Sequence, residues 1–123
     1  MAQQQQPRHI VLMLPNQEKA ITTTLEELGR QHERKIQNEV DAVRLFHKDV
    51  QIDFGFTRQH RRVILVVPVH GYEEDLMAQF GENQLASKIL GHRVYGAVVA
   101  YRKSKHGNSK VDLQAHHLFK KDQ

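Results

Sequence analysis

Two short apolar runs, IVLML at 10–14 and VILVVPV at 63–69, constrain the fold of this chain most strongly. Both have the length of a strand and are far shorter than the about 20 residues that cross a bilayer. A chain of 123 residues forms one domain, and its core is large enough only if such segments converge on one sheet. We therefore expect a single sheet-based domain without a membrane span.

Residues 25–39 have the spacing of an amphipathic helix. Thr24, followed three residues later by Glu27, matches a capping box at the start of this helix. The positions that recur at intervals of three and four residues are Leu25, Leu28, His32, Ile36 and Val40. They form one apolar stripe. Gly29 lies inside the segment and weakens the helix by roughly 1 kcal/mol relative to alanine.

Most of the other segments favour strands. Residues 8–14 end at the turn sequence PNQE, so a hairpin with residues 19–24 is expected, although 19–24 also fits the beginning of the helix. Residues 42–46 and 50–56 alternate between apolar and polar side chains, as in a strand with one buried face. Residues 63–69 are nearly all apolar, as in a strand covered on both faces, and Pro68 must interrupt or end its ladder.

The carboxyl end fits either a loose basic arm or a terminal hairpin. Apolar and polar residues alternate between Val111 and Phe119, and HGN at 106–108 supplies residues suited to a tight turn. A disordered arm does not need such alternation. We therefore predict a hairpin of Val94–Arg102 with Val111–Phe119.

The predicted fold class is α+β: a mostly antiparallel sheet of four to six strands, with the helix at about 25–39 packed on one face and short helices near 73–90. Residues 1–8 are expected to be a flexible glutamine-rich N-terminus, residues 9–119 the domain, and residues 120–123 a tail. The predicted core comprises Ile10, Leu12, Leu25, Leu28, Ile36, Ile52, Phe54, Ile64, Val66, Val98 and Val99.

Positive charge is concentrated at the carboxyl end. Residues 1–100 contain twelve bases and twelve acids, whereas residues 101–123 contain six bases and two acids. A second basic cluster, RQHRR, spans residues 58–62. If these two strand connections emerge at the same end of the sheet, they form one patch for nucleic-acid phosphates. The candidate contacts are Arg58, Arg61, Arg62, Arg102, Lys103, Lys105 and Lys110. The alternative is that turns and edge strands carry these charges to stay solvated and to deter aggregation.

The sequence contains no motif that specifies catalysis, a metal or a cofactor. It has no cysteine, and its glycines do not match a phosphate-binding loop. HERKI at 32–36 resembles the start of a zinc-protease helix, but Ile36 occupies the place of the required second histidine. His116 and His117 would point to opposite faces of a strand. We expect no catalytic residue, no metal and no cofactor.

One cluster of potential ligands leaves an enzymatic alternative open. His70 precedes Glu73, Glu74 and Asp75 in the sequence, so that nitrogen and oxygen donors lie within six residues. Acids in the first turn of a helix are also stabilised by the helix dipole. An ordinary helix start is therefore the preferred interpretation of this cluster.

Two stretches resemble a family of small phage- and plasmid-borne proteins of uncharacterised function. They are IVLMLPNQEKAITTTLEEL, which fits strand, turn, strand and capped helix, and VILVVP followed by NQLAS and GHRVYGAVVAYR. The charged region at 46–62 and the basic end after Arg102 depart from the family pattern. The resemblance implies a compact α+β domain carried by a mobile element, and it transfers no active site.

Three functions remain as hypotheses. The first is a non-enzymatic accessory or regulatory module that contacts nucleic acid. The second is a protein-interaction module, or a homodimer formed by pairing of an exposed edge strand. The third is a small enzyme with a site near His70. A cytoplasmic location without a membrane partner is expected, because the N-terminus lacks a secretion signal.

Overall fold

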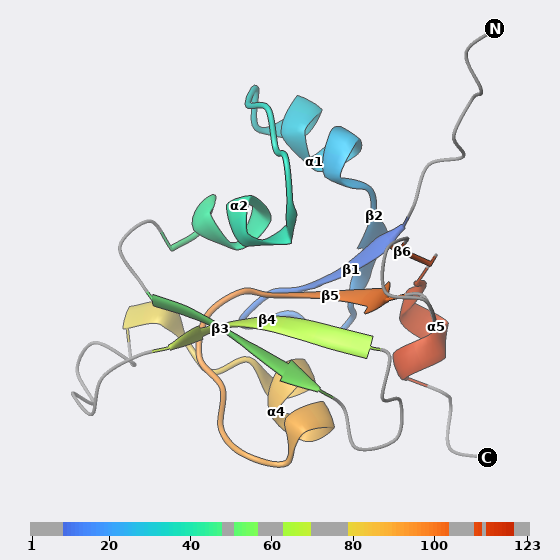
Figure 1. Ribbon diagram of the computed structural model, residues 1–123. Coiled ribbons are helices and arrows are strands. Elements are labelled where there is room, and N and C mark those ends of the chain that lie inside the picture. The colour runs from blue at the N-terminus through green and yellow to red at the C-terminus, as the bar shows by residue number, and fades with distance from the viewer. Residues whose placement is uncertain are drawn as a thin grey trace, which may run out of the picture.

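The computed structural model describes residues 9–47, 51–56, 63–69, 79–103, 110–111 and 113–119. A six-stranded sheet forms its centre, and all pairings of its neighbouring strands are antiparallel. Helices lie on both sides of this sheet (Figure 1). The predicted α+β class with a mostly antiparallel sheet is therefore confirmed.

The strands follow the order β2, β1, β5, β4 and β3 across the sheet, and β6 pairs with β5. Their bounds are β1 (Ile10–Met13), β2 (Ile21–Thr23), β3 (Gln51–Phe56), β4 (Val63–Val69), β5 (Val98–Lys103) and β6 (Lys110–Val111). The expected first hairpin is present, since Leu12 of β1 lies opposite Ile21 of β2. β4 ends one residue after Pro68, which has no amide hydrogen for the ladder.

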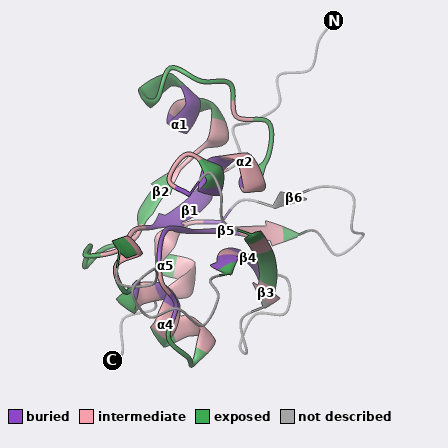
Figure 2. Cartoon of the chain, turned by 90° about the vertical axis from the view of Figure 1, so that its left-hand side faces the viewer, coloured by how far each residue is buried: buried purple, intermediate pink, exposed green. Residues whose placement is uncertain are grey.

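Apolar side chains cover both faces of the sheet. Helices α1 (Leu25–Gln31) and α2 (Glu39–Arg44) lie on one face, and α4 (Gln84–Leu90) and α5 (Ala115–Leu118) on the other. The α1–α2 face buries Ile10, Leu12, Leu28, Ala42, Val43, Val66 and Val99. The α4–α5 face buries Val11, Met13, Val63, Leu65, Ala86, Val94, Val98, Ala100 and Leu113. Neighbours along a strand alternate between the two sets, and Figure 2 shows the buried residues concentrated on the central strands.

Most of the predicted core is buried. The confirmed residues are Ile10, Leu12, Leu28, Ile64, Val66, Val98 and Val99. Leu25, Ile36 and Ile52 are partly buried and pack on the α1–α2 face. Phe54 is wrong as a core residue, because 49% of its surface is exposed. It lies on β3, which is the last strand of the sheet and has one neighbour among the described strands.

The helix predicted over 25–39 is wrong in its extent, because two short helices with a connection between them replace it. α1 begins as predicted, and Thr24 Oγ1 accepts a hydrogen bond from the N–H of Glu27 at 3.0 Å. α2 has its own N-cap, since Asn38 Oδ1 accepts a hydrogen bond from the N–H of Asp41 at 2.9 Å. Each helix therefore starts at a side chain that satisfies a free amide.

α1 stops early because the chain folds back over its last turn. Glu33 adopts a left-handed conformation with φ of 53°. The N–H of Glu33 donates to the carbonyl of Arg30 at 3.3 Å, and the N–H of Arg34 donates to the carbonyl of Gly29 at 2.9 Å. This pair of bonds is a Schellman motif, which ends a helix. Gly29 permits the close approach, because a β-carbon there would collide with the carbonyl oxygen of Arg34.

Two further segment predictions have different outcomes. Residues 42–46 were expected to be extended, but they continue α2 up to Arg44 and then turn. The alternation of apolar and polar residues at 42–46 does not lead to a strand here. Ala42 and Val43 are neighbours in the chain, and both are buried against the α1–α2 face. Of the short helices predicted near 73–90, one is confirmed by α4, whereas residues 73–78 lie outside the described residues.

The predicted terminal hairpin of Val94–Arg102 with Val111–Phe119 is correct only near its turn. β5 pairs with β6 over two positions, one of which joins Lys103 to Lys110. Beyond β6 the chain forms α5, so the strand predicted there is wrong.

Helical spacing explains this difference. Ala115, Leu118 and Phe119 pack against the α4–α5 face, and intervals of three and four residues bring such side chains onto one side of a helix. The N–H of Gln114 donates to His117 Nδ1 at 3.0 Å and caps the first turn. Leu118, which breaks the strand alternation, fits the helical pattern.

A buried asparagine connects three parts of the α4–α5 face. Asn83 is fully buried, and its Nδ2 donates to the carbonyls of Met13 at 2.9 Å and Gly96 at 2.8 Å. Its Oδ1 accepts a hydrogen bond from the N–H of Ala86 at 3.1 Å, as the N-cap of α4. The same amide group therefore fixes α4 to β1 and to the loop before β5.

Gly29→Ala tests the fold-back at the end of α1. In an ordinary helix this change adds roughly 1 kcal/mol of stability. Here the added β-carbon meets backbone, so we expect the free energy of unfolding to fall by about 1–3 kcal/mol. Urea denaturation measures this, and Glu33→Gly is the control expected to stabilise, because glycine favours a positive φ. A stabilised Gly29→Ala protein would contradict the fold-back.

Asn83→Ala and Asn38→Ala compare two N-caps that differ in burial. Asn38→Ala removes an exposed cap, and we expect a loss of about 1 kcal/mol of stability. Asn83→Ala also leaves two buried carbonyls without a donor, so a loss of roughly 3–5 kcal/mol is expected. Thermal and urea unfolding of both variants measure the difference. Equal losses would show that the two Nδ2 bonds contribute nothing.

Candidate functional site

Four strand ends that flank the predicted basic connections lie at one end of the sheet. β3 ends at Phe56 and β4 begins at Val63, opposite Arg102. β5 ends at Lys103, opposite Lys110 at the start of β6. Because neighbouring strands are antiparallel, both connections, 57–62 and 104–109, begin and end at this same end. We call the strand ends with Arg102, Lys103 and Lys110 the basic end of the sheet.

The structure describes only part of the predicted contact set. Arg102 is half-buried and Lys103 is exposed. Lys110 is described as a strand position, without its side chain. The other predicted contacts, Arg58, Arg61, Arg62 and Lys105, lie outside the described residues, although Arg62 directly precedes Val63 in the sequence.

The register pairs two lysines at the basic end. Lys103 and Lys110 are Cα partners in the antiparallel ladder. Like charges at directly opposite positions destabilise such a pair. An anion bound at this end would relieve the repulsion.

Tyr101 belongs to the core beside the basic end. It lies opposite Ile64 and packs with the α1–α2 face. Burial, and after it the negative charge of Glu39, raises the pKa of the Tyr101 hydroxyl above its ordinary value of 10.0. The neutral form is therefore favoured, and the partly buried ring packs against the α1–α2 face.

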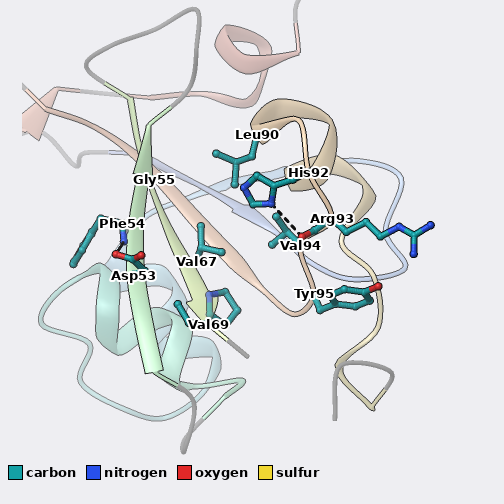
Figure 3. A pocket seen from close by; sticks show the side chains of 11 residues that line it. Asp53, Phe54, Gly55, Val67, Val69, Leu90, His92, Arg93, Val94 and Tyr95 are labelled. Atoms are coloured by element: carbon teal, nitrogen blue, oxygen red, sulfur yellow. Dashed lines mark hydrogen bonds between the residues drawn. The ribbon is translucent and has the colours of Figure 1, made fainter. Parts of the chain in front are cut away.

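A pocket of about 280 Å³ lies between the β3–β4 edge and the loop after α4 (Figure 3). Its lining comprises Asp53, Phe54, Gly55, Val67, Pro68, Val69, Leu90, His92, Arg93, Val94 and Tyr95. Val67, Leu90 and Val94 supply an apolar floor, and Figure 3 shows the Arg93 side chain extending away from the two strands. His92 Nδ1 lies 3.2 Å from the carbonyl oxygen of Arg93. The pocket thus combines an apolar floor with a polar rim.

This pocket was not predicted, because its walls come from segments about 40 residues apart in the chain. One local signal was available in Gly55, since a glycine inside a strand often marks the close approach of another group. A β-carbon at Gly55 would lie 3.3 Å from Leu90 Cδ2 and 4.0 Å from Val67 Cγ2. Leu90 therefore packs where a larger residue on β3 would interfere.

The histidines described by the structure have structural contacts. His32 Nδ1 lies 3.0 Å from the carbonyl oxygen of Leu28, and its ring meets the ring of Phe46 edge-on. His116 and His117, expected on opposite faces of a strand, instead lie in α5 with ring centroids 4.2 Å apart. Within the described ranges, no group of three or more potential ligands is positioned to hold a metal ion.

The alternative enzymatic site lies outside the described residues, because His70, Glu73, Glu74 and Asp75 all fall in the gap at 70–78. In the part of the chain that the structure covers, no helix has the length and apolar character needed to span a bilayer. Comparison with protein-family models, curated proteins and solved structures finds no match to this chain.

The titration of Tyr101 gives a prediction for alkaline pH. A raised pKa in the folded state means that the stability contributed by neutral Tyr101 is complete below pH 10.0 and is lost as the pH rises toward the folded-state pKa. Tyr101→Phe cannot ionise, so we expect its unfolding free energy to fall less steeply above pH 10.0 than that of the wild type. Urea midpoints measured on both sides of this pH test the prediction. Parallel curves for the two proteins would contradict it.

Proposed function

We propose that this protein is a non-enzymatic accessory or regulatory module of the cytoplasm that contacts nucleic-acid phosphates through the basic end of the sheet. The observation that carries the proposal is the register of β4, β5 and β6. It pairs Val63 with Arg102 and Lys103 with Lys110, so both basic connections start from adjacent strand ends. The surplus positive charge of residues 101–123 begins at the same strand ends.

The chemistry of phosphate contact suits this arrangement. Arginine and lysine side chains neutralise phosphates and release condensed counterions, which gives affinity without sequence preference. The paired lysines at the end of β5 gain from an anion, because it replaces like-charge repulsion with attraction. No groove-reading helix is needed for binding of this kind.

The width of the basic end limits the expected affinity. Four strands, β6, β5, β4 and β3, lie next to one another there, and a spacing of about 4.8 Å gives a width of about 14 Å. Phosphate charges on one strand of a duplex follow each other at about 3.4 Å along the axis. The end therefore reaches about four phosphates of one strand, which agrees with micromolar rather than tight binding.

Fluorescence anisotropy with labelled duplex and single-stranded oligonucleotides tests this proposal at two salt concentrations. We expect binding at low salt that weakens as salt increases, with little difference between sequences. The double variant Arg102→Gln with Lys103→Gln removes two of the described charges. The plot of log K against log salt concentration has a negative slope, and we expect the magnitude of this slope to be smaller by about 2 in the variant.

The matched control is Arg34→Gln with Lys35→Gln, which removes the same charge from exposed positions after α1. It should retain the wild-type slope and most of the affinity. Absence of binding at low salt would refute the proposal, and so would equal losses in the two double variants, because equal losses indicate a general charge effect.

A further inference from the structure

β3 offers an open edge for pairing. It is the last strand in the sheet, and among the described strands its one partner is β4. In an antiparallel strand, alternate residues direct their N–H and C=O groups toward opposite neighbours. Half of the backbone groups of Gln51–Phe56 therefore point to the outer side, where none of the described strands pairs with them, and such edges readily pair with another chain.

The outward positions can be identified from one hydrogen bond. The N–H of Phe54 donates to Oδ1 of the preceding Asp53 at 2.7 Å. Figure 3 shows the Phe54 side chain on the side of β3 away from Val67 and Val69 of β4. The amide of Phe54 thus faces the open edge, and the backbone groups of Ile52 and Phe56, two residues away, face the same way.

Two features of this edge fit a binding surface. The first is that Phe54 is 49% exposed. The second is that Phe54 lies opposite the buried Val66, so its ring extends the apolar α1–α2 face toward the edge of the sheet. A strand added at β3 would cover this ring.

Symmetry leaves few registers for a second copy of the same strand. A two-fold axis perpendicular to the sheet keeps the faces aligned, so it lies midway between one residue and the same residue of the second copy. An axis at Asp53 would set two carboxylates opposite each other, and like charges there are destabilising. An axis at Gly55 would pair three described residues of each strand, 54–56. An axis at Phe54 pairs the two phenylalanines and sets each Asp53 opposite Gly55, where no side chain competes for space.

We propose that β3 pairs antiparallel with β3 of a second copy of this chain, centred on Phe54, and that Asp53 opposes this pairing by occupying the Phe54 amide in the monomer. The paired segment, residues 52–56 of each copy, makes about six backbone hydrogen bonds. The two sheets then join into one continuous sheet. This interface uses the side of β3 and does not depend on nucleic-acid binding at the basic end.

Sedimentation velocity across a concentration series tests the association. We expect a reversible monomer–dimer equilibrium for the wild type. Asp53→Ala frees the Phe54 amide, so its dimer should be tighter by about tenfold. Phe54→Lys adds like charges at the centre of the interface and should remain a monomer. The matched control is Ile21→Lys on β2, the opposite edge strand, where 42% of the residue is exposed; it should associate as the wild type does.

A crosslink tests the register separately. The chain has no cysteine, and directly opposite residues of a hydrogen-bonded pair have α-carbons about 5.5 Å apart, within disulfide range. Phe54→Cys should therefore form a covalent dimer rapidly under oxidised glutathione, whereas Ile21→Cys should not. Circular dichroism confirms that each variant is folded.

Three outcomes would overturn the inference. The first is that wild type and Asp53→Ala both remain monomeric at all concentrations. The second is that Ile21→Lys abolishes association as completely as Phe54→Lys. The third is that Phe54→Cys and Ile21→Cys crosslink at equal rates. The oligonucleotide assay reads binding at the basic end independently, so failure of one proposal is distinguishable from failure of the other.

Discussion

The burial of β5 on both faces is the constraint on which the rest of this structure depends. Val98, Val99 and Ala100 are all inaccessible to solvent, and consecutive residues of a strand point to opposite faces. The apolar faces of the sheet must therefore both be covered by helices. α1 and α2 meet this requirement on one side, and α4 and α5 meet it on the other.

This double covering leaves the ends and edges of the sheet as the available surfaces. Asn83 and the loop before β5 close the α4–α5 face, because the Asn83 amide satisfies backbone carbonyls from two segments. Surplus charge collects where β5 and β6 meet, and apolar surface remains exposed at Phe54 on β3. The two proposed activities therefore use different margins of one sheet: a basic end for phosphates and an open edge for a second copy.

Local patterns predicted the elements that local interactions decide. The runs at β1 and β4 were recognisable as strands because their apolar residues are contiguous and short, and Thr24 marked the start of α1 because its hydroxyl binds an amide three residues away. The same patterns failed where contacts across the fold dominate. α1 stops because the chain returns over Gly29, and α5 forms where its apolar residues dock against the α4–α5 face.

The sequence by itself determined the α+β class, the strand-forming runs and the concentration of positive charge after residue 100, since these follow from composition and short-range spacing. Tertiary structure alone decided which strand ends are neighbours, which strand lies at the edge, and which apolar residue stays exposed. The physical reason is that strand order and register arise from pairing between distant segments. In the sequence, Asp53 and Phe54 show the same alternation of polar and apolar residues as any strand with a buried face. They belong to an edge strand because β3 lacks a second neighbour among the described strands.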